Sequence, residues 1–158
     1  MKLISLRSFL PPSTLAAAAT LAFAALTASG GAATAQSTLV PFAADVRDHV
    51  YDEQRGLLYI TTDAGTLERY DISQQQLLAP WTIGTSLQGC DITPDGQYLY
   101  VCEGAISGGQ GFIYRVDLDS GAVTDIAYDR DFGEGGAWDV AIANNGKGFV
   151  TTQYLGSG

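Results

Sequence analysis

Histidine, cysteine and basic residues are scarce in this chain. Its 158 residues include one His, two Cys and eight Lys or Arg, against 17 Asp or Glu, and the net charge is −9. An acidic chain without a basic cluster repels nucleic-acid phosphates and anionic lipid headgroups, so neither is expected as a partner. The sequence holds no Ser/His/Asp set, no phosphate loop and no Cys-x-x-Cys-His haem site. We therefore expect no catalytic, cofactor-binding or metal-binding residue in it.

Long apolar runs are also missing, apart from a short one near the N-terminus. A basic start precedes an uncharged apolar stretch at residues 15–26, and Ala33-Thr34-Ala35 follows with a small-x-small pattern. The stretch is well short of the roughly 20 residues that a membrane-spanning helix needs. We expect residues 1–35 to be a signal peptide cleaved after Ala35, and the protein to be periplasmic, cell-surface or extracellular, with no membrane insertion after cleavage.

Glycine and tyrosine are abundant, and they recur in a pattern. A β-rich start, a Gly-bearing turn and an aromatic-aliphatic-Thr/Cys strand appear at residues 50–61, 92–102 and 142–152. The turn of the second segment is Pro94-Asp95-Gly96, in which Pro presets φ, Asp can bond the backbone ahead and Gly accepts a left-handed conformation. Each segment therefore predicts a β-hairpin.

A second segment repeats without gaps, because residues 65–77 align with residues 111–123. The alignment superposes Arg69-x-Asp71 on Arg115-x-Asp117. A charge pair at the same place in each repeat indicates structure, through bonds to turn backbone or between neighbouring units, more than a catalytic role. The second unit carries extra residues at 103–111, which we expect to form a loop.

The spacing of the repeats defines the expected fold class. A period in the forties with about four short strands per unit is typical of β-propeller blades, and the lack of a 3.6-residue period excludes a helical solenoid. We expect an all-β domain over residues 36–158, with about two and a half four-stranded blades of a larger ring of roughly seven. The predicted blades are residues 48–81, residues 88–128 and an incomplete blade at residues 138–158. A complete small β-sheet protein is the alternative.

Residues 39–42, within a predicted outer strand at residues 38–42, resemble residues 78–81, which end the first unit where the outermost strand of a blade belongs. The mature chain is therefore expected to begin with an outer strand. In a closed propeller such a strand completes the last blade and removes an exposed sheet edge.

The run at residues 83–101 resembles the YVTN type of β-propeller repeat, which has a Gly, an aliphatic-Ser/Thr-Pro-Asp-Gly turn and a Tyr-Val-Thr-Asn strand. Residues 59–62, 100–103 and 149–152 are similar to three successive versions of that strand. The sequence departs from the pattern at Cys102 and Glu103. The resemblance implies a propeller, and propellers of this type serve as surface-layer proteins, lactonase-like enzymes and subunits of periplasmic redox enzymes.

Cys90 and Cys102 lie on the two arms of the predicted central hairpin. If the turn is centred near Asp95, their equal parity puts them on the same face. If Gly96 forms a bulge, Cys90 lies opposite Tyr100 and Cys102 is a diagonal neighbour, close to the upper limit for a disulfide. Export to an oxidising compartment would permit that bond, and buried free thiols are the equal alternative. A metal or redox role is disfavoured because a metal site needs three or four ligands. We expect an ordinary blade position for the lone His49.

The segment containing Asp129, Asp131 and Glu134 beside several glycines is the most site-like loop of the sequence. Clustered carboxylates could bind Ca²⁺ through their oxygens. The segment lacks the Asp-x-Asp-x-Asp-Gly spacing of a dedicated calcium loop, so a solvated loop is favoured.

The function expected from these observations is a non-catalytic binding protein or a surface or periplasmic scaffold, whose partner is a protein or a small molecule. Residues 103–111 and 127–137 fall where propellers present ligand-contact loops. The alternative is an enzyme, either a lactonase-like hydrolase or a redox-complex subunit, with its active site in further blades.

Overall fold

The computed structural model describes residues 3–7 and 37–154, which form thirteen strands and no helix. No segment of this described part is therefore a helix that could cross a membrane. β1 (Leu3–Arg7) and β2 (Ser37–Pro41) pair antiparallel in a compact unit of their own. β1 lies inside the predicted signal peptide, and β2 covers most of the predicted outer strand. Cleavage after Ala35 and closure of a ring by residues 38–42 both stay predictions.

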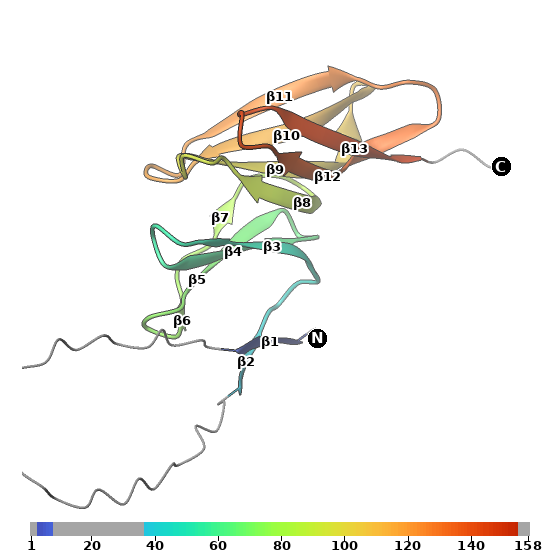
Figure 1. Cartoon of the computed structure of the whole chain (residues 1–158). Helices are drawn as coiled ribbons and strands as arrows, with labels where there is room; N and C mark the ends of the chain where they lie inside the picture. The colour runs from blue at the N-terminus through green and yellow to red at the C-terminus, as the bar shows by residue number, and fades with distance from the viewer. Residues whose placement is uncertain (1–2, 8–36, 155–158) are drawn as a thin grey trace, which may run out of the picture. The chain divides into compact units, whose positions relative to one another are not determined.

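Three antiparallel sheets, one per repeat, make up the remaining unit (Figure 1). The first blade consists of β3 (Val46–Asp52), β4 (Leu57–Thr62) and β5 (Thr66–Asp71), with β6 (Gln76–Leu77) and β7 (Trp81–Thr82) both paired to β5. The second consists of β8 (Leu87–Ile92), β9 (Tyr98–Ser107), β10 (Gln110–Asp117) and β11 (Val123–Asp129). The third consists of β12 (Glu134–Ile142) and β13 (Gly148–Tyr154). The predicted class, a partial β-propeller, is confirmed, and these sheets do not close into a ring.

The blades stack face to face because each sheet has apolar residues on both faces. Successive residues of a strand point to opposite faces, so Tyr59 of β4 packs toward the second blade, in a core with Leu87 and Leu99. On the other face of the second blade, Cys102 packs against Ala137 and Val140 of the third blade. Each blade thus covers the next one along the chain.

The extra residues of the second unit do not form the expected loop. They lengthen β9 and β10 into a longer hairpin, whose turn contains Gly108 (φ +59°) and Gly109 (φ +85°). Most of residues 127–137 likewise belongs to β11 and β12. The expectation of long contact loops was wrong because these polar and Gly-rich residues can also continue an antiparallel ladder.

The central hairpin turns at Gly96 (φ +69°), and Asp95 Oδ1 accepts a hydrogen bond from the Gln97 amide at 3.0 Å. The ladder resumes where the Thr93 amide donates to the Tyr98 carbonyl at 2.9 Å. This four-residue loop places Cys90 opposite Val101, one residue away from the register expected for a bulged turn. Because a one-residue shift reverses the face of a side chain, Cys90 and Cys102 lie on opposite faces. The same-face prediction was wrong, and both are free thiols.

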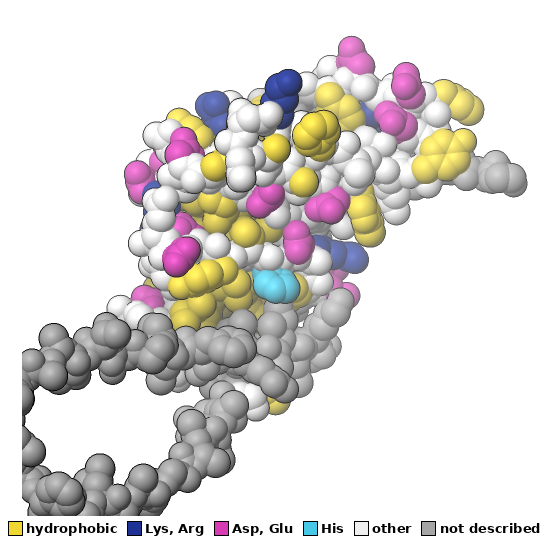
Figure 2. Space-filling view, viewed as in Figure 1, with side chains coloured by type: hydrophobic (Ala, Val, Ile, Leu, Met, Phe, Trp, Pro, Cys, Tyr) yellow, Lys and Arg dark blue, Asp and Glu magenta, His cyan; other side chains and the backbone are white. Residues whose placement is uncertain are grey.

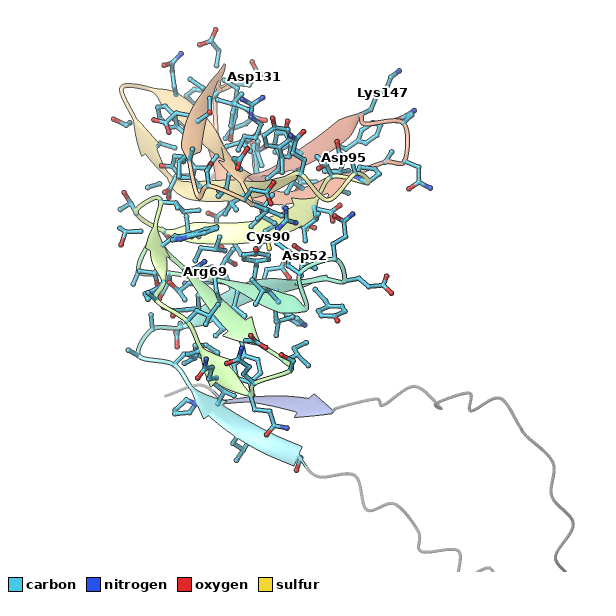
Figure 3. The ribbon with its side chains drawn as sticks, turned by 90° about the vertical axis from the view of Figure 1, so that its left-hand side faces the viewer. Asp52, Arg69, Cys90, Asp95, Asp131 and Lys147 are labelled. Carbon is cyan, nitrogen blue, oxygen red and sulfur yellow. The ribbon has the colours of Figure 1, made fainter. Side chains whose placement is uncertain are left out.

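The two cysteines are buried in different cores. Cys90 lies between the first and second blades, as Figure 3 shows, and Cys102 lies between the second and third. Burial raises the pKa of Cys90 and raises that of Cys102 to about 12. Both thiols therefore stay protonated and unreactive near neutral pH.

The repeated Arg-x-Asp pairs have the structural role that their repetition predicts. Asp71 accepts hydrogen bonds from the Ser73 hydroxyl at 2.7 Å and from the Gln74 amide at 2.9 Å, which lower its pKa. Asp117 closes the corresponding turn of the second blade by accepting from the hydroxyl and amide of Ser120. Arg69 donates to the Ala79 carbonyl at 2.7 Å and lies 4.1 Å from the centre of the Trp81 ring.

Candidate functional site at the inner strands

Each inner strand carries an irregularity near its first residues. The register shifts between Val46 and Asp48 in β3, between Leu87 and Cys90 in β8, and beside Trp138 in β12. A β-bulge turns side chains out of the regular alternation and often lies next to a binding site. The same device at the same place in three blades brings the irregular residues together.

These residues line one pocket of about 340 Å³, which the three inner strands share. Its lining consists of Val46, Arg47, Asp48, Gln88, Gly89, Trp138 and Asp139. Arg47 and Trp138 are exposed, and 48% of the Trp138 surface is accessible. The pocket therefore combines a flat aromatic surface with a guanidinium group, a primary amide and two carboxylates.

Both carboxylates of the pocket are fixed by backbone amides. Asp48 Oδ2 accepts a hydrogen bond at 2.9 Å from the amide of Cys90, in the next blade. The equivalent amide in the third blade belongs to Val140, and its acceptor is Oδ1 of Asp139, also at 2.9 Å. The Cys90 amide thus bonds an Asp of the preceding blade, whereas the Val140 amide bonds an Asp of its own blade. The preceding blade cannot supply an acceptor to Val140, because its residue at the position of Asp48 is Gly89, which has no side chain.

Gly89 and Asp139 fit together as a pair. A Cβ atom on Gly89 would lie 2.8 Å from Cα of Asp139 and would collide with its Oδ1. The missing side chain at position 89 thus leaves the room that the Asp139 carboxylate occupies. We call Asp48, Gly89 and Asp139 the carboxylate position of the three blades.

The other polar groups of the pocket are also held. Arg47 lies 3.6 Å from Asp63 in an ion pair, and both side chains are partly exposed. Gln88 is buried, and its amide nitrogen donates to Ser86 Oγ at 3.3 Å. In the described part of the chain, no group of three or more His, Cys, Asp or Glu is arranged to hold a metal ion. The pocket offers fixed donors and acceptors, without a paired nucleophile and base.

The sequence-predicted candidates lie elsewhere. His49 is exposed on β3, opposite Ile60 and outside the pocket lining. Glu134 Oε2 accepts from the Asp131 amide at 2.8 Å, and its Oε1 accepts from the Thr152 hydroxyl at 2.9 Å. Asp129 accepts from the Gln110 side chain at 3.1 Å. The acidic segment thus fixes its own turn, and its carboxylates do not converge on one point.

Glu103 is a structural residue for which the sequence analysis assigned no role. Its side chain is 2% exposed, and its carboxylate accepts hydrogen bonds from the amides of Thr85 (2.6 Å), Ser86 (2.9 Å) and Ala105 (2.8 Å), and from the Tyr114 hydroxyl (3.3 Å). It thereby fixes the segment that connects the first two blades. The signal was its departure from the repeat, since the first blade has Thr62 at this position.

Comparisons with known proteins support the fold. No family model and no curated protein matches the sequence. Among solved structures, hydrazine synthase of Kuenenia stuttgartiensis, which has β-propeller domains, matches 76% of this chain with a TM-score of 0.62 and 22% identity. A functionally unknown protein of Desulfotomaculum acetoxidans matches 67% with a TM-score of 0.54 and 16% identity. The chain spans about a third of each of these chains, 33% and 32% of their lengths. At these identities the likeness shows the fold alone.

Proposed function

We propose that this chain belongs to an exported, non-catalytic binding propeller that contacts a polar small molecule or a partner protein at the inner-strand pocket. The observation that carries the proposal is the convergence of the three bulges on Arg47, Gln88 and Trp138. A bulge interrupts the hydrogen-bond ladder, so three aligned bulges favour a use for the side chains that they turn aside.

The pocket chemistry supports binding more than turnover. Asp48 and Asp139 each accept a backbone amide, which keeps their oxygens in fixed positions. An indole face, a guanidinium and fixed carboxylates suit a neutral, hydroxyl-rich ligand, because the face can stack on C–H groups while the charged groups accept and donate hydrogen bonds. The enzyme alternative places its active site in further blades and is favoured by inward-facing Glu, Asp, Asn or His from such blades.

Binding is tested with Trp138 as the reporter. The chain holds two Trp, so Trp81→Phe leaves Trp138 as the single tryptophan. We expect a saturable change in its emission with at least one of two neutral probes, maltotetraose or cellotetraose. Arg47→Ala should abolish the change, and Lys147→Ala, a charge removed outside the pocket lining, should preserve it (Figure 3). No saturable change with either probe, or equal loss in both variants, would contradict the pocket proposal. Hydrolysis of a lactone by a protein that carries the further blades would favour the enzyme.

Export is tested separately by mass spectrometry of the protein recovered outside the cytoplasm. The mature N-terminus is expected at Gln36, because the small-x-small pattern ends at Ala35. Recovery of the intact protein beginning at Met1 would contradict cleavage.

A further inference from the structure

The outer strand of the second blade has a free edge. β11 pairs with β10 on one side, and no strand of the unit formed by residues 42–154 pairs with its other side (Figure 1). Its ladder with β10 runs over seven residue pairs without a register shift. All of its side chains are exposed except that of Tyr128, which is half-buried. β11 is therefore a continuous and regular edge strand in contact with solvent.

The outer edge of the first blade is built differently. It consists of β6 and β7, which have two residues each and are separated by residues 78–80. Pro80 has no amide hydrogen to offer, and the Ala79 carbonyl already accepts hydrogen bonds from Arg69. Short strands, Pro, Lys and bulges are the features that keep a sheet edge from pairing with another chain. β11 has none of them.

Alternate residues of β11 direct their backbone groups away from β10. The Asp117 amide donates to the Ala122 carbonyl at 2.9 Å, so these two residues form a hydrogen-bonded pair of the antiparallel ladder. Because such pairs alternate with pairs that are not hydrogen-bonded, residues 124, 126 and 128 direct their amides and carbonyls to β10. The backbone groups available to an added strand are those of Val123, Asp125, Ala127 and Asp129.

The side chains along this edge differ between its two faces. Asp125 and Asp129 project on one face, and Ile126 and Tyr128 project on the other, because successive residues of a strand alternate. The charges within β11 are therefore all negative, as is the net charge of the chain, −9. Figure 2 shows acidic side chains next to hydrophobic ones in the region where Figure 1 draws the end of β11.

We infer that the free edge of β11 is a docking site for an extended, basic segment of a partner protein, which adds a strand to this sheet. Main-chain hydrogen bonds to the outward backbone groups hold the segment, and its side chains provide specificity. The residues opposite Asp125 and Asp129 are Lys or Arg, and those opposite Ile126 and Tyr128 are apolar. The segment therefore has the pattern cation-apolar-x-apolar-cation. No residue of β11 lines the inner-strand pocket, so this docking does not depend on the pocket.

A second copy of this chain is a poorer occupant of the edge. When two β11 edges pair antiparallel, outward-pointing residues lie opposite outward-pointing residues in every register. Asp125 and Asp129 of both copies would then share one face, where like charges destabilise the sheet. Two chains of net charge −9 also repel each other.

The test combines the full chain with a peptide of the sequence Thr-Lys-Val-Thr-Val-Lys-Thr, acetylated and amidated at its ends. Hydrogen exchange followed by nuclear magnetic resonance reports on the edge directly. With saturating peptide, the outward amides of Val123, Asp125, Ala127 and Asp129 should exchange about tenfold more slowly. The Ile126 amide, which already bonds β10, should change less. Two control peptides should give little protection: one is N-methylated at both Lys and at the central Thr, and the other has Glu in place of both Lys.

Three protein variants test the two parts of the recognition. Ala127→Pro removes an outward amide, which an edge strand tolerates, and it should weaken peptide binding about tenfold. The double variant Asp125→Asn with Asp129→Asn should also weaken binding about tenfold. Glu53→Gln, which removes an exposed carboxylate between β3 and β4, should leave binding unchanged. Circular dichroism checks that each variant is folded.

Several outcomes would overturn the inference. One is the absence of protection at the outward amides with the Lys peptide, and another is equal binding of the N-methylated peptide. A dimer in which these amides are protected without peptide would show that a second copy occupies the edge. A change in the Trp138 indole signal without protection along β11 would show that the peptide binds at the pocket instead.

Discussion

The first and third blades carry the same hairpin, yet their equivalent aromatic residues are in opposite environments. Tyr59 is 0% exposed, whereas Phe149 is 67% exposed. The hairpin sequences do not produce this difference, since both place an aromatic side chain on the face toward the next blade. A blade of this type therefore gains its stability from its neighbour, as expected where each unit contacts only adjacent units.

The two interfaces between blades also differ in their polar contacts. At the first, Arg55 donates to Asp52 at 2.9 Å and to the Gly96 carbonyl at 2.8 Å, and it also pairs with Asp119 of the second blade. At the second, Asp91 accepts from the Ile142 amide at 2.7 Å, and a hollow of about 280 Å³ lies beside Val150. The first interface combines packing with a guanidinium clamp, and the second is less completely filled.

The largest expected effect comes from truncating the two aromatic residues. Tyr59→Ala should lower the free energy of unfolding by about 4 kcal/mol, because it empties a core position. Phe149→Ala should change it by less than about 0.5 kcal/mol, because the side chain is exposed in this chain. Urea unfolding followed by circular dichroism measures both values. Equal losses would remove the basis of the comparison.

The next effect concerns Glu103. Glu103→Ala should cost about 3 kcal/mol, since it leaves buried amide donors without an acceptor. Glu103→Gln keeps one acceptor oxygen and should cost about half as much. Hydrogen exchange of the Thr85 and Ser86 amides should accelerate in the Ala variant, with the Asn144 amide in the third-blade turn as the unaffected control. Unchanged exchange at Thr85 and Ser86 would contradict the role of this carboxylate.

A smaller effect is expected at the carboxylate position. Gly89→Ala should destabilise the protein by about 2 kcal/mol, because the new methyl group collides with Asp139. The double variant Gly89→Ala with Asp139→Gly removes the carboxylate that the new methyl group meets, and it should recover at least about 1 kcal/mol relative to the sum of the single changes. Strict additivity in this double-mutant cycle would show that the two residues act independently.

The smallest effect is that of the two thiols. Their folded pKa values lie above the ordinary 9.0, so their contribution to stability is complete below pH 9 and is lost as pH rises toward about 12. The free energy of unfolding measured in urea should be lower at pH 10.5 than at pH 8. This loss should be smaller in Cys102→Ala than in the unmodified protein. At pH 8 both thiols should react with dithionitrobenzoate about 100-fold faster in urea than in the native state. Fast native labelling, or no labelling in urea without reductant, would contradict two buried free thiols.

Repetition made the fold predictable from the sequence, because period, turn residues and strand pattern all recur. The register of the central hairpin was not predictable, since Pro94-Asp95-Gly96 fits both a bulged turn and the observed four-residue loop, and one residue decides the face of each cysteine. The pocket was also missed. The residue types of Arg47 and Trp138 do not show that they lie in β-bulges. The role of Gly89 can be recognised only from its contact with Asp139, which is distant in sequence and close in space.

The pairing of Gly89 with Asp139 has a consequence for the arithmetic of a ring. A side chain at position 89 would collide with Asp139 of the next blade, and the three blades here read Asp, Gly, Asp at the carboxylate position. Such alternation can run around a ring with an even number of blades. In a ring with an odd number it must fail at one junction, so parity alone would force that junction to differ from all the others.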